Sequence, residues 1–139
     1  MSNLGPLYSS MPTTVGHTEH YFAERHIQLD TRGTLKIDPD SKWGFGVKVI
    51  TLSHSNAGGT EGENWSTTVD RPVIVEAGAW IGSYAILYNC HIGARAVVAL
   101  GTVVRSQVIA PDVMVAGNPA RVIARFVGGA WSYLGDKLE

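Results

Sequence analysis

Aliphatic side chains return every six residues along the second half of the chain, with small residues at fixed offsets from them. The units run over 75–80, 81–86, 92–97 and 98–103, and each begins with Val or Ile. The step from Leu87 to Ile92 is five residues long, which indicates a deletion inside a regular array. A period of six fits neither an amphipathic helix, with a period near 3.6, nor the two-residue alternation of a hairpin. It is typical of a solenoid, in which each unit forms one short side of a coil.

The repeat also predicts which side chains form the core. The aliphatic residue of each unit should point inward, where stacking shields it from water at roughly 25 cal/mol per Å² of apolar surface. We expect Gly82, Gly93 and Gly101 to turn the corners with backbone angles that a Cβ would penalise. Small residues suited to the interior beside these turns follow in the same units: Ala85, Ala96 and Thr102.

The same register extends backwards into the first half of the chain. Six-residue steps lead from Ile37 through Trp43 to Val49, and another leads from Leu29 to Leu35. Trp43 is too large for a narrow column, so its coil should be distorted or lie near the end of the stack. The sequence therefore predicts an irregular N-terminal arm over 1–26, a solenoid over 27–126 and a C-terminal tail over 127–139.

A segment without the aliphatic repeat, 55–71, separates the two blocks and is rich in Gly, Ser, Thr, Asn and Glu. We expect a loop that is expelled from the solenoid. Long loops of this kind in compact domains are usually functional or disordered. Trp65 in its middle favours function, because an exposed Trp generally covers something.

Composition limits the classes of function. The 139 residues suit one domain, and 11 basic against 12 acidic residues give no electrostatic footprint for nucleic acid. No apolar run is long enough to insert into a membrane, and the N-terminus lacks the pattern of a signal peptide. One cysteine excludes an intramolecular disulfide. A cytoplasmic protein is the default expectation.

Two motifs carry a resemblance to a known family. The stretch 75–123, and in it Ala-Trp-Ile-Gly-Ser at 79–83 and Val-Ala-Gly-Asn-Pro-Ala-Arg-Val-Ile at 115–123, resembles the hexapeptide-repeat acyltransferases. Within that family the chain is most similar to maltose and galactoside O-acetyltransferases and to the acetyltransferases of polysaccharide synthesis. The resemblance implies an all-β fold, a left-handed parallel β-helix with three units per coil. It also implies a homotrimer that binds acetyl-CoA as co-substrate in the grooves between subunits.

The resemblance assigns the chemistry to His54, where the repeat breaks and the loop begins. A His at the matching place in the family takes the proton from a hydroxyl of the acceptor while that oxygen attacks the thioester of acetyl-CoA. An imidazole with a pKa near its reference value of about 6.5 suits this role. The implied reaction transfers the acetyl group directly to the acceptor, which is a small molecule or a glycan. The expected acceptor is a sugar or a glycan precursor. Ser83 resembles the family residue that steadies the developing oxyanion, although a turn serine would look the same.

The remaining site residues carry over from the family in the same way. Trp80 resembles an aromatic residue that lines the acceptor site, although packing at a coil corner would also explain it. Trp65 is expected at the acceptor site because of its place in the expelled loop, and Asp30 either joins them by orienting His54 or is a turn residue. Small residues would allow the pantetheine arm to approach closely, and arginines suit its phosphates. The expected cofactor-binding residues are Ser83, Leu100, Gly101, Arg105, Ala116, Gly117, Arg121 and Arg125.

The chain also departs from the family pattern. Arg105-Ser106 stands where relatives often have Thr-Lys, and 21–24 lacks the Asn that many sugar acetyltransferases place in the acceptor pocket. This chain shows little or nothing of the N-terminal helical region that helps those enzymes to bind the acceptor. The identity of the acceptor is therefore not determined by the resemblance.

The remaining histidines and the cysteine raise two further possibilities, a metal site and a catalytic Cys–His pair. His17, His20 and His26 could be metal ligands, but no Cys or carboxylate cluster accompanies them, and no metal is expected. Cys90 and His91 are adjacent in a strand, so their side chains should point to opposite faces and form no catalytic pair. Two alternatives remain open: a catalytically silent trimer that serves as a scaffold or binding module, and a metalloenzyme like the γ-class carbonic anhydrases.

Overall fold

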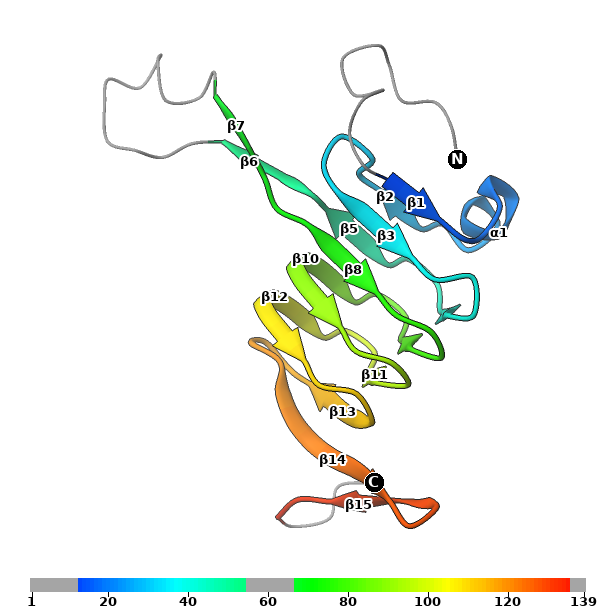
Figure 1. Cartoon of the computed structure of the whole chain (residues 1–139), viewed down its shortest axis with the longest axis vertical. Helices are drawn as coiled ribbons and strands as arrows, with labels where there is room; N and C mark the ends of the chain where they lie inside the picture. The colour runs from blue at the N-terminus through cyan, green and yellow to red at the C-terminus, as the bar shows by residue number, and fades with distance from the viewer. Residues whose placement is uncertain (1–12, 55–66, 136–139) are drawn as a thin grey trace.

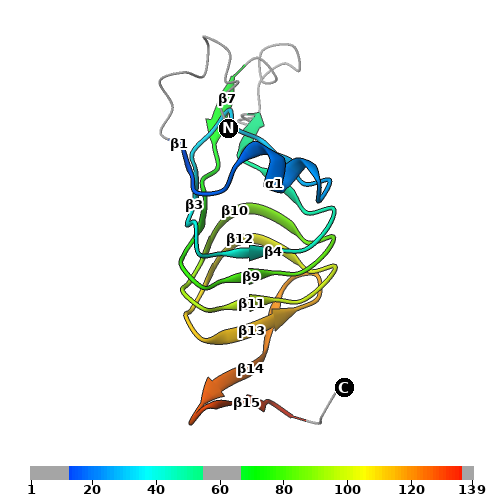
Figure 2. The same cartoon turned by 90° about the vertical axis from the view of Figure 1, so that its right-hand side faces the viewer.

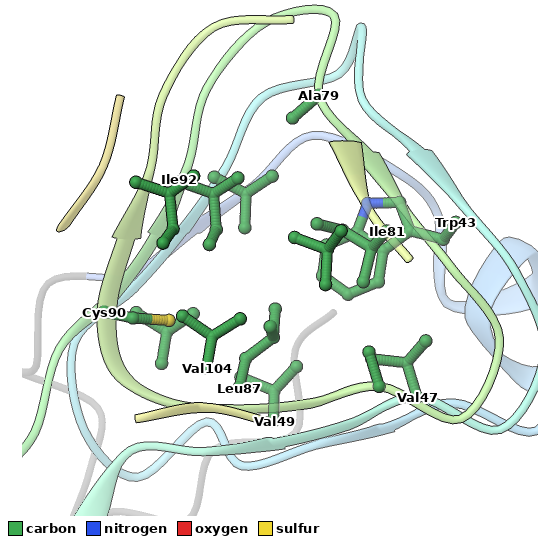
Figure 3. Close-up of a cluster of buried hydrophobic side chains, with 14 of the residues drawn as sticks. Trp43, Val47, Val49, Ala79, Ile81, Leu87, Cys90, Ile92 and Val104 are labelled. Atoms are coloured by element: carbon green, nitrogen blue, oxygen red, sulfur yellow. The ribbon is translucent and has the colours of Figure 1, made fainter. Parts of the chain in front are cut away.

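The chain winds into a left-handed parallel β-helix, which confirms the solenoid expected from the repeat and the fold class implied by the family resemblance. The structure, a computed structural model, describes residues 13–54 and 67–135. Successive coils stack along the long axis with their strands in parallel register (Figures 1 and 2). The cross-section is a triangle (Figure 3), and we name its three faces A1, A2 and B.

Each face is a stack of short strands. Face A1 contains β1 (Thr13–Val15), β3 (Leu35–Ile37), β8 (Val73–Val75) and the second halves of β10 (Ile86–Ile92) and β12 (Val103–Ile109). Face A2 contains β2 (Gln28–Leu29), β5 (Lys48–Ile50) and the first halves of β10 and β12. Face B contains β4 (Lys42–Trp43), β9 (Trp80–Ile81), β11 (Val97–Val98) and β13 (Val113–Ala116). Parallel neighbours need a long connection between them, and here the rest of the coil provides it.

Apolar side chains in register form one inward column on each face. The columns are Trp43, Ile81, Val98 and Val115 on face B; Val49, Leu87 and Val104 on face A2; and Ile37, Val75, Ile92 and Ile109 on face A1. All of these residues are buried. Figure 3 shows side chains from the three faces meeting in the middle of the triangle. The aliphatic positions of the predicted units are thus the core of the protein.

Three edges join the faces, and we name each after a residue or segment on it. The Ser83 edge borders faces B and A2 and consists of residues 44–47, 82–85, 99–102 and 117–120. The Arg95 edge joins faces A1 and B and consists of residues 38–41, 76–79, 93–96 and 110–112. The arm edge joins faces A2 and A1, and there β10 and β12 turn at single residues, Asn89 with φ 51° and Ser106 with φ 52°. This one-residue turn explains the five-residue step from Leu87 to Ile92.

The reason predicted for two of the corner glycines is wrong. Gly101 has φ 68° and needs its conformational freedom, as expected. Gly82 and Gly93 have no such backbone angle, and the neighbouring coil explains them instead. A Cβ on Gly82 would lie 2.7 Å from the carbonyl oxygen of Val98, and one on Gly93 would lie 2.7 Å from that of Ile109. These glycines therefore permit close stacking of the coils.

The N-terminal end of the stack is covered by helix α1 (Glu19–Ala23), which lies within the segment predicted as an irregular arm. Phe22 is buried and packs edge to face on Trp43, with ring centroids 5.6 Å apart. Trp43 is itself buried, and its indole nitrogen donates to the hydroxyl of Ser41 over 2.9 Å. The large Trp43 therefore fits because it lies near the end of the stack under the helix.

An arm leaves the stack at the arm edge, where the 55–71 loop was expected. The chain leaves the coils after Thr51 and returns to them after Asp70, and we call this junction the base of the arm. Beyond it, an antiparallel pair of strands, β6 (Leu52–His54) and β7 (Thr68–Asp70), projects away from the body of the molecule (Figure 1). Trp65 lies outside the described residues. The arm replaces the one-residue turn that the next coils make at Asn89 and Ser106.

The C-terminal end of the stack reverses direction. After β13 the chain returns as β14 (Arg121–Val127), antiparallel to β13, and β15 (Ala130–Tyr133) pairs with it in turn. The hairpin extends face B beyond the last coil (Figure 2). The regular stack of coils therefore ends at β13.

Candidate functional site

His54 lies on the arm, one strand away from the body of the protein. It is the last residue of β6 and is exposed, and it stands opposite Thr68 of β7. The preceding strand, β5, ends on face A2 at Ile50, and Thr51 then directs the chain outward. The break in the repeat therefore places an exposed imidazole on the arm, clear of the core.

A groove on the Ser83 edge contains three of the predicted site residues. It has a volume of about 290 Å³ and is lined by Trp80, Ser83 and Leu100, with Gly44, Gly82 and residues 97–99 completing its wall. The side chain of Trp80 is 57% exposed and that of Leu100 is 77% exposed. Large apolar side chains with this much exposure, next to a groove, are typical of a surface that binds something.

Ser83 is held in place by its neighbours in the stack. Its hydroxyl oxygen accepts a hydrogen bond from the backbone N–H of Phe45 over 3.0 Å. Its carbonyl oxygen accepts from the N–H of Gly101 over 2.8 Å. Because the hydroxyl acts as an acceptor toward Phe45, its own proton can be donated to a ligand. Ser83 can therefore stabilise a negatively charged oxygen in the groove.

The other predicted cofactor-binding residues follow Ser83 along the same edge. Gly101 lies one coil further, next to Leu100, and Gly117 follows in the coil after that, where its carbonyl accepts from Val103 N over 3.0 Å. Ala116 ends β13, and Gly117 turns the chain with φ 94°. The edge is thus a line of small residues and exposed backbone, which suits a long, thin ligand.

The three predicted phosphate-binding arginines are spread over different parts of the surface. Arg121 and Arg125 are both exposed on β14. Arg121 stands opposite Ala116, next to the Ser83 edge, and donates to the carbonyl of Ala120 over 3.3 Å. Arg125 stands opposite Val113, at the end of face B next to the Arg95 edge. Arg105 is exposed at the end of the A2 half of β12, next to Ser106 on the arm edge. Arg121 therefore lies near the line of small residues, Arg105 lies near the arm, and Arg125 lies near the Arg95 edge.

His54 and Ser83 are not brought together within one chain. His54 belongs to the arm edge and Ser83 to the Ser83 edge, and the whole width of face A2 separates the two edges. The candidate residues consequently form two half-sites on one chain, one with an imidazole and one with the groove.

Asp30 belongs to the base of the arm. Its carboxylate accepts from Arg32 Nε over 2.7 Å and from the backbone N–H of Thr51 over 3.1 Å. Partial burial opposes the charged form, but the hydrogen bonds from Arg32 and Thr51 outweigh it, so the pKa of Asp30 lies below its usual value. These contacts support the interpretation of Asp30 as a turn residue that also fixes the start of the arm.

The arm edge carries a second groove. It has a volume of about 320 Å³, and its polar lining comes from Asn89, His91, Ser106 and Gln107. His91 points outward from face A1, and its Nε2 contacts the carboxylate of Glu76. Cys90 points inward and is buried, as expected from the alternation along a strand, and burial raises the pKa of its thiol to about 12.

The N-terminal histidines take part in packing and surface contacts. His17 stacks on the ring of Tyr21, with centroids 3.9 Å apart, and its Nε2 hydrogen-bonds the carbonyl of Ser41 over 2.7 Å. His20 lies 3.5 Å from a carboxylate oxygen of Glu24. Within 13–54 and 67–135, no three residues among His, Cys, Asp and Glu are grouped so that they could hold a metal ion. In the same ranges, no helix has the length and apolar character needed to cross a membrane.

Comparison with solved structures supports the family resemblance. A hexapeptide-repeat-containing acetyltransferase from Vibrio cholerae, in complex with acetyl coenzyme A, is 28% identical with a TM-score of 0.60 over 72% of this chain and 54% of that one. A maltose O-acetyltransferase from Clostridium difficile 630 is 24% identical with a TM-score of 0.62 over 71% of this chain and 52% of that one. A galactoside acetyltransferase in complex with coenzyme A is 24% identical with a TM-score of 0.50 over 68% and 50%.

These similarities confirm that the fold is that of the hexapeptide-repeat acetyltransferases. At 24% identity, the two sugar acetyltransferases support the fold alone. The chain spans about half the length of the structures that it matches. No family model matches the sequence, and no curated protein matches it.

Proposed function

We propose that the protein is an acetyltransferase that moves an acetyl group from acetyl-CoA to a hydroxyl of a sugar or glycan precursor. One observation carries the proposal: the predicted cofactor-binding residues Ser83, Gly101 and Gly117 follow one another along a single edge. The V. cholerae acetyltransferase, which shares the fold, was solved with acetyl coenzyme A. An edge lined by small residues, with a groove beside it, suits the extended pantetheine arm of this co-substrate.

The working assembly in this proposal is a homotrimer with its sites between subunits. His54 and the groove lie on different edges of one chain, so a site that uses both needs a second copy. A head-to-tail contact between the arm edge of one copy and the Ser83 edge of the next would join the half-sites, and such contacts close into rings. Exposed side chains on the Ser83 edge support this arrangement, because Phe45 is 54% and Tyr84 is 67% exposed.

The proposed chemistry needs one proton transfer and one nucleophilic attack. His54 takes the proton from the acceptor hydroxyl as the oxygen attacks the thioester carbonyl, and the hydroxyl of Ser83 stabilises the oxygen that becomes negative. When the carbon–sulfur bond breaks, the imidazolium of His54 returns the proton to the departing thiolate. The products are the acetyl ester and free CoA, so atoms and charges balance without a covalent enzyme intermediate.

The remaining residues bind the two substrates in this proposal. Trp80 borders the groove and would cover the apolar face of a sugar, and Trp65 keeps the acceptor role that the sequence assigns to it. Arg121 follows the line of small residues and would take the CoA phosphates, to which guanidinium groups are well matched. Arg125 is the weaker candidate for this role, because it stands at the far end of face B. Asp30 acts through the base of the arm rather than on the acceptor.

The test measures free thiol released from acetyl-CoA with a panel of sugar acceptors. We expect His54→Ala to lower the rate of transfer at least about a hundredfold, the usual scale for loss of a general base, with nearly unchanged affinity for acetyl-CoA. His20→Ala is the matched control, because His20 is exposed on α1, away from both half-sites. Equal activity of the His54→Ala variant and wild type would remove His54 from the mechanism. Failure of the wild type to bind acetyl-CoA at about millimolar concentration would favour a scaffold.

A further inference from the structure

The two described strands of the arm that carries His54 meet the stacked coils at the base of the arm. Its two strands, β6 and β7, project away from the stacked coils (Figure 1). A two-stranded ribbon is marginally stable by itself in water. The contacts at the base therefore help to position the strand that carries His54.

Asp70, the last residue of β7, fixes one side of the base. Its two carboxylate oxygens accept from the backbone N–H of Thr34 over 2.8 Å and from the hydroxyl of Thr34 over 2.6 Å. Hydrogen bonds to a charged carboxylate are about twice as strong as those between neutral groups. Thr34 belongs to the turn 30–34 between β2 and β3, which is part of the preceding coil.

Thr51, just before β6, fixes the other side of the base to the same turn. Its hydroxyl donates to the carbonyl of Asp30 over 2.8 Å and accepts from the N–H of Gly33 over 2.9 Å. Thr51 is fully buried, and its carbonyl accepts from the N–H of Arg71 over 2.7 Å, which ties the outgoing and returning chains together.

Gly33 lies between the two sides of the base, where there is no room for a side chain. A Cβ at this position would be 2.3 Å from the carbonyl oxygen of Thr51 and 2.6 Å from a carboxylate oxygen of Asp70. The turn is therefore inserted between the outgoing and the returning chain. We call the five residues Asp30, Gly33, Thr34, Thr51 and Asp70 the clasp.

We propose that the clasp positions His54 for catalysis, with Asp70 as the principal positioning residue. Asp70 stands opposite Leu52, and His54 follows two residues later in the same strand pair, opposite Thr68. A shift at Asp70 is therefore passed directly to the imidazole. A displacement of about 1 Å at a reacting group can cost a hundredfold in rate. The inference rests on the proposed function, in which His54 is the general base.

The first measurement compares kcat and acetyl-CoA affinity among variants of Asp70. Asp70→Ala should lower kcat by about tenfold to a hundredfold with acetyl-CoA affinity within about twofold of wild type. Asp70→Asn can still accept from the N–H of Thr34 and should recover most of the loss. Thr34→Val removes one of the two bonds and should give a smaller loss that is not additive with Asp70→Ala. The control is Asp112→Ala, an exposed carboxylate bonded to Arg95 on the opposite edge, with kcat like wild type.

The second measurement is hydrogen exchange, which does not depend on activity. In Asp70→Ala, the backbone amides of β6 and β7 should exchange faster, whereas those of β10 and β12 should keep their wild-type rates. Unchanged exchange in the arm would overturn the clasp, whatever the activity. Faster exchange with wild-type kcat would overturn its positioning role, and so would equal losses of kcat and acetyl-CoA affinity. A wild type without transfer activity would instead refute the proposed function, and the exchange result would still decide whether the clasp holds the arm.

Discussion

Replacing Gly82 with Ala tests whether close stacking of the coils builds the Ser83 edge. A Cβ at this position would lie 2.7 Å from the backbone nitrogen of Leu100 and 2.8 Å from the carbonyl carbon of Ala99. These atoms belong to the backbone of the next coil and cannot rotate away, so the coils must separate. Overpacking of this kind costs about 1–3 kcal/mol. The lower entropy of the unfolded Ala chain offsets about 0.4–1 kcal/mol, which leaves a net loss of about 1–2 kcal/mol.

The assay is urea unfolding followed by circular dichroism at one fixed protein concentration, because self-association would shift the midpoint. We expect the midpoint of Gly82→Ala to fall with the slope unchanged. Gly93→Ala is the matched control, since its Cβ would lie 2.7 Å from Pro111 N on the Arg95 edge. Both variants should lose similar stability, but only Gly82→Ala should lose affinity for acetyl-CoA. A wild-type midpoint for Gly82→Ala would refute the close-stacking argument.

Two further predictions follow from side-chain pKa values. Burial raises the pKa of Cys90 to about 12, so the folded protein should lose stability as the pH rises from about 9 toward 12, because the unfolded chain releases the thiol proton first. An aromatic disulfide reagent at about pH 8 should label Cys90 only in denaturant, and rapid labelling of the native protein would contradict this. The pKa of Asp30 is lowered, so its contribution to stability is present above about pH 4 and disappears as the pH falls through the lower folded value. Asp30→Asn should therefore flatten the acid side of the stability curve measured by urea unfolding, and parallel curves would refute the assignment.

The core could be predicted because its signal is local. Ile81, Leu87 and Val98 each begin or continue a six-residue unit, and each is buried where the unit places it. The reason why position 82 requires glycine could not be found in this way, because it depends on the distance to the backbone of the next coil. The reversal of the chain after β13 could not be predicted from the six-residue repeat either. The repeat predicts parallel coils, whereas β14 pairs antiparallel with β13.

The candidate site was predictable in its parts more than in its arrangement. Ser83, Leu100 and Gly117 follow one another at the step that separates Ile86 of β10 from its partner Val103 of β12, and Gly101 is next to Leu100. Their line along one edge therefore follows from the register. The separation of His54 from that line does not, because a single sequence carries no sign of which edges of two copies meet. The clasp joins residues 36 positions apart, Thr34 and Asp70, on either side of a break in the repeat.

The two ends of the stack determine how the protein avoids forming fibres. A parallel stack of coils exposes unpaired strand edges at its ends, and such edges can recruit the matching strand of another molecule. At one end, α1 covers the column above Trp43, and at the other, β14 runs in the opposite direction to every coil strand of face B. The outermost strand at this end is β15, which belongs to the same antiparallel hairpin, so a second molecule would meet a short hairpin in place of a further coil. The number of coils is thereby limited, and lengthwise polymerisation is opposed by the fold itself.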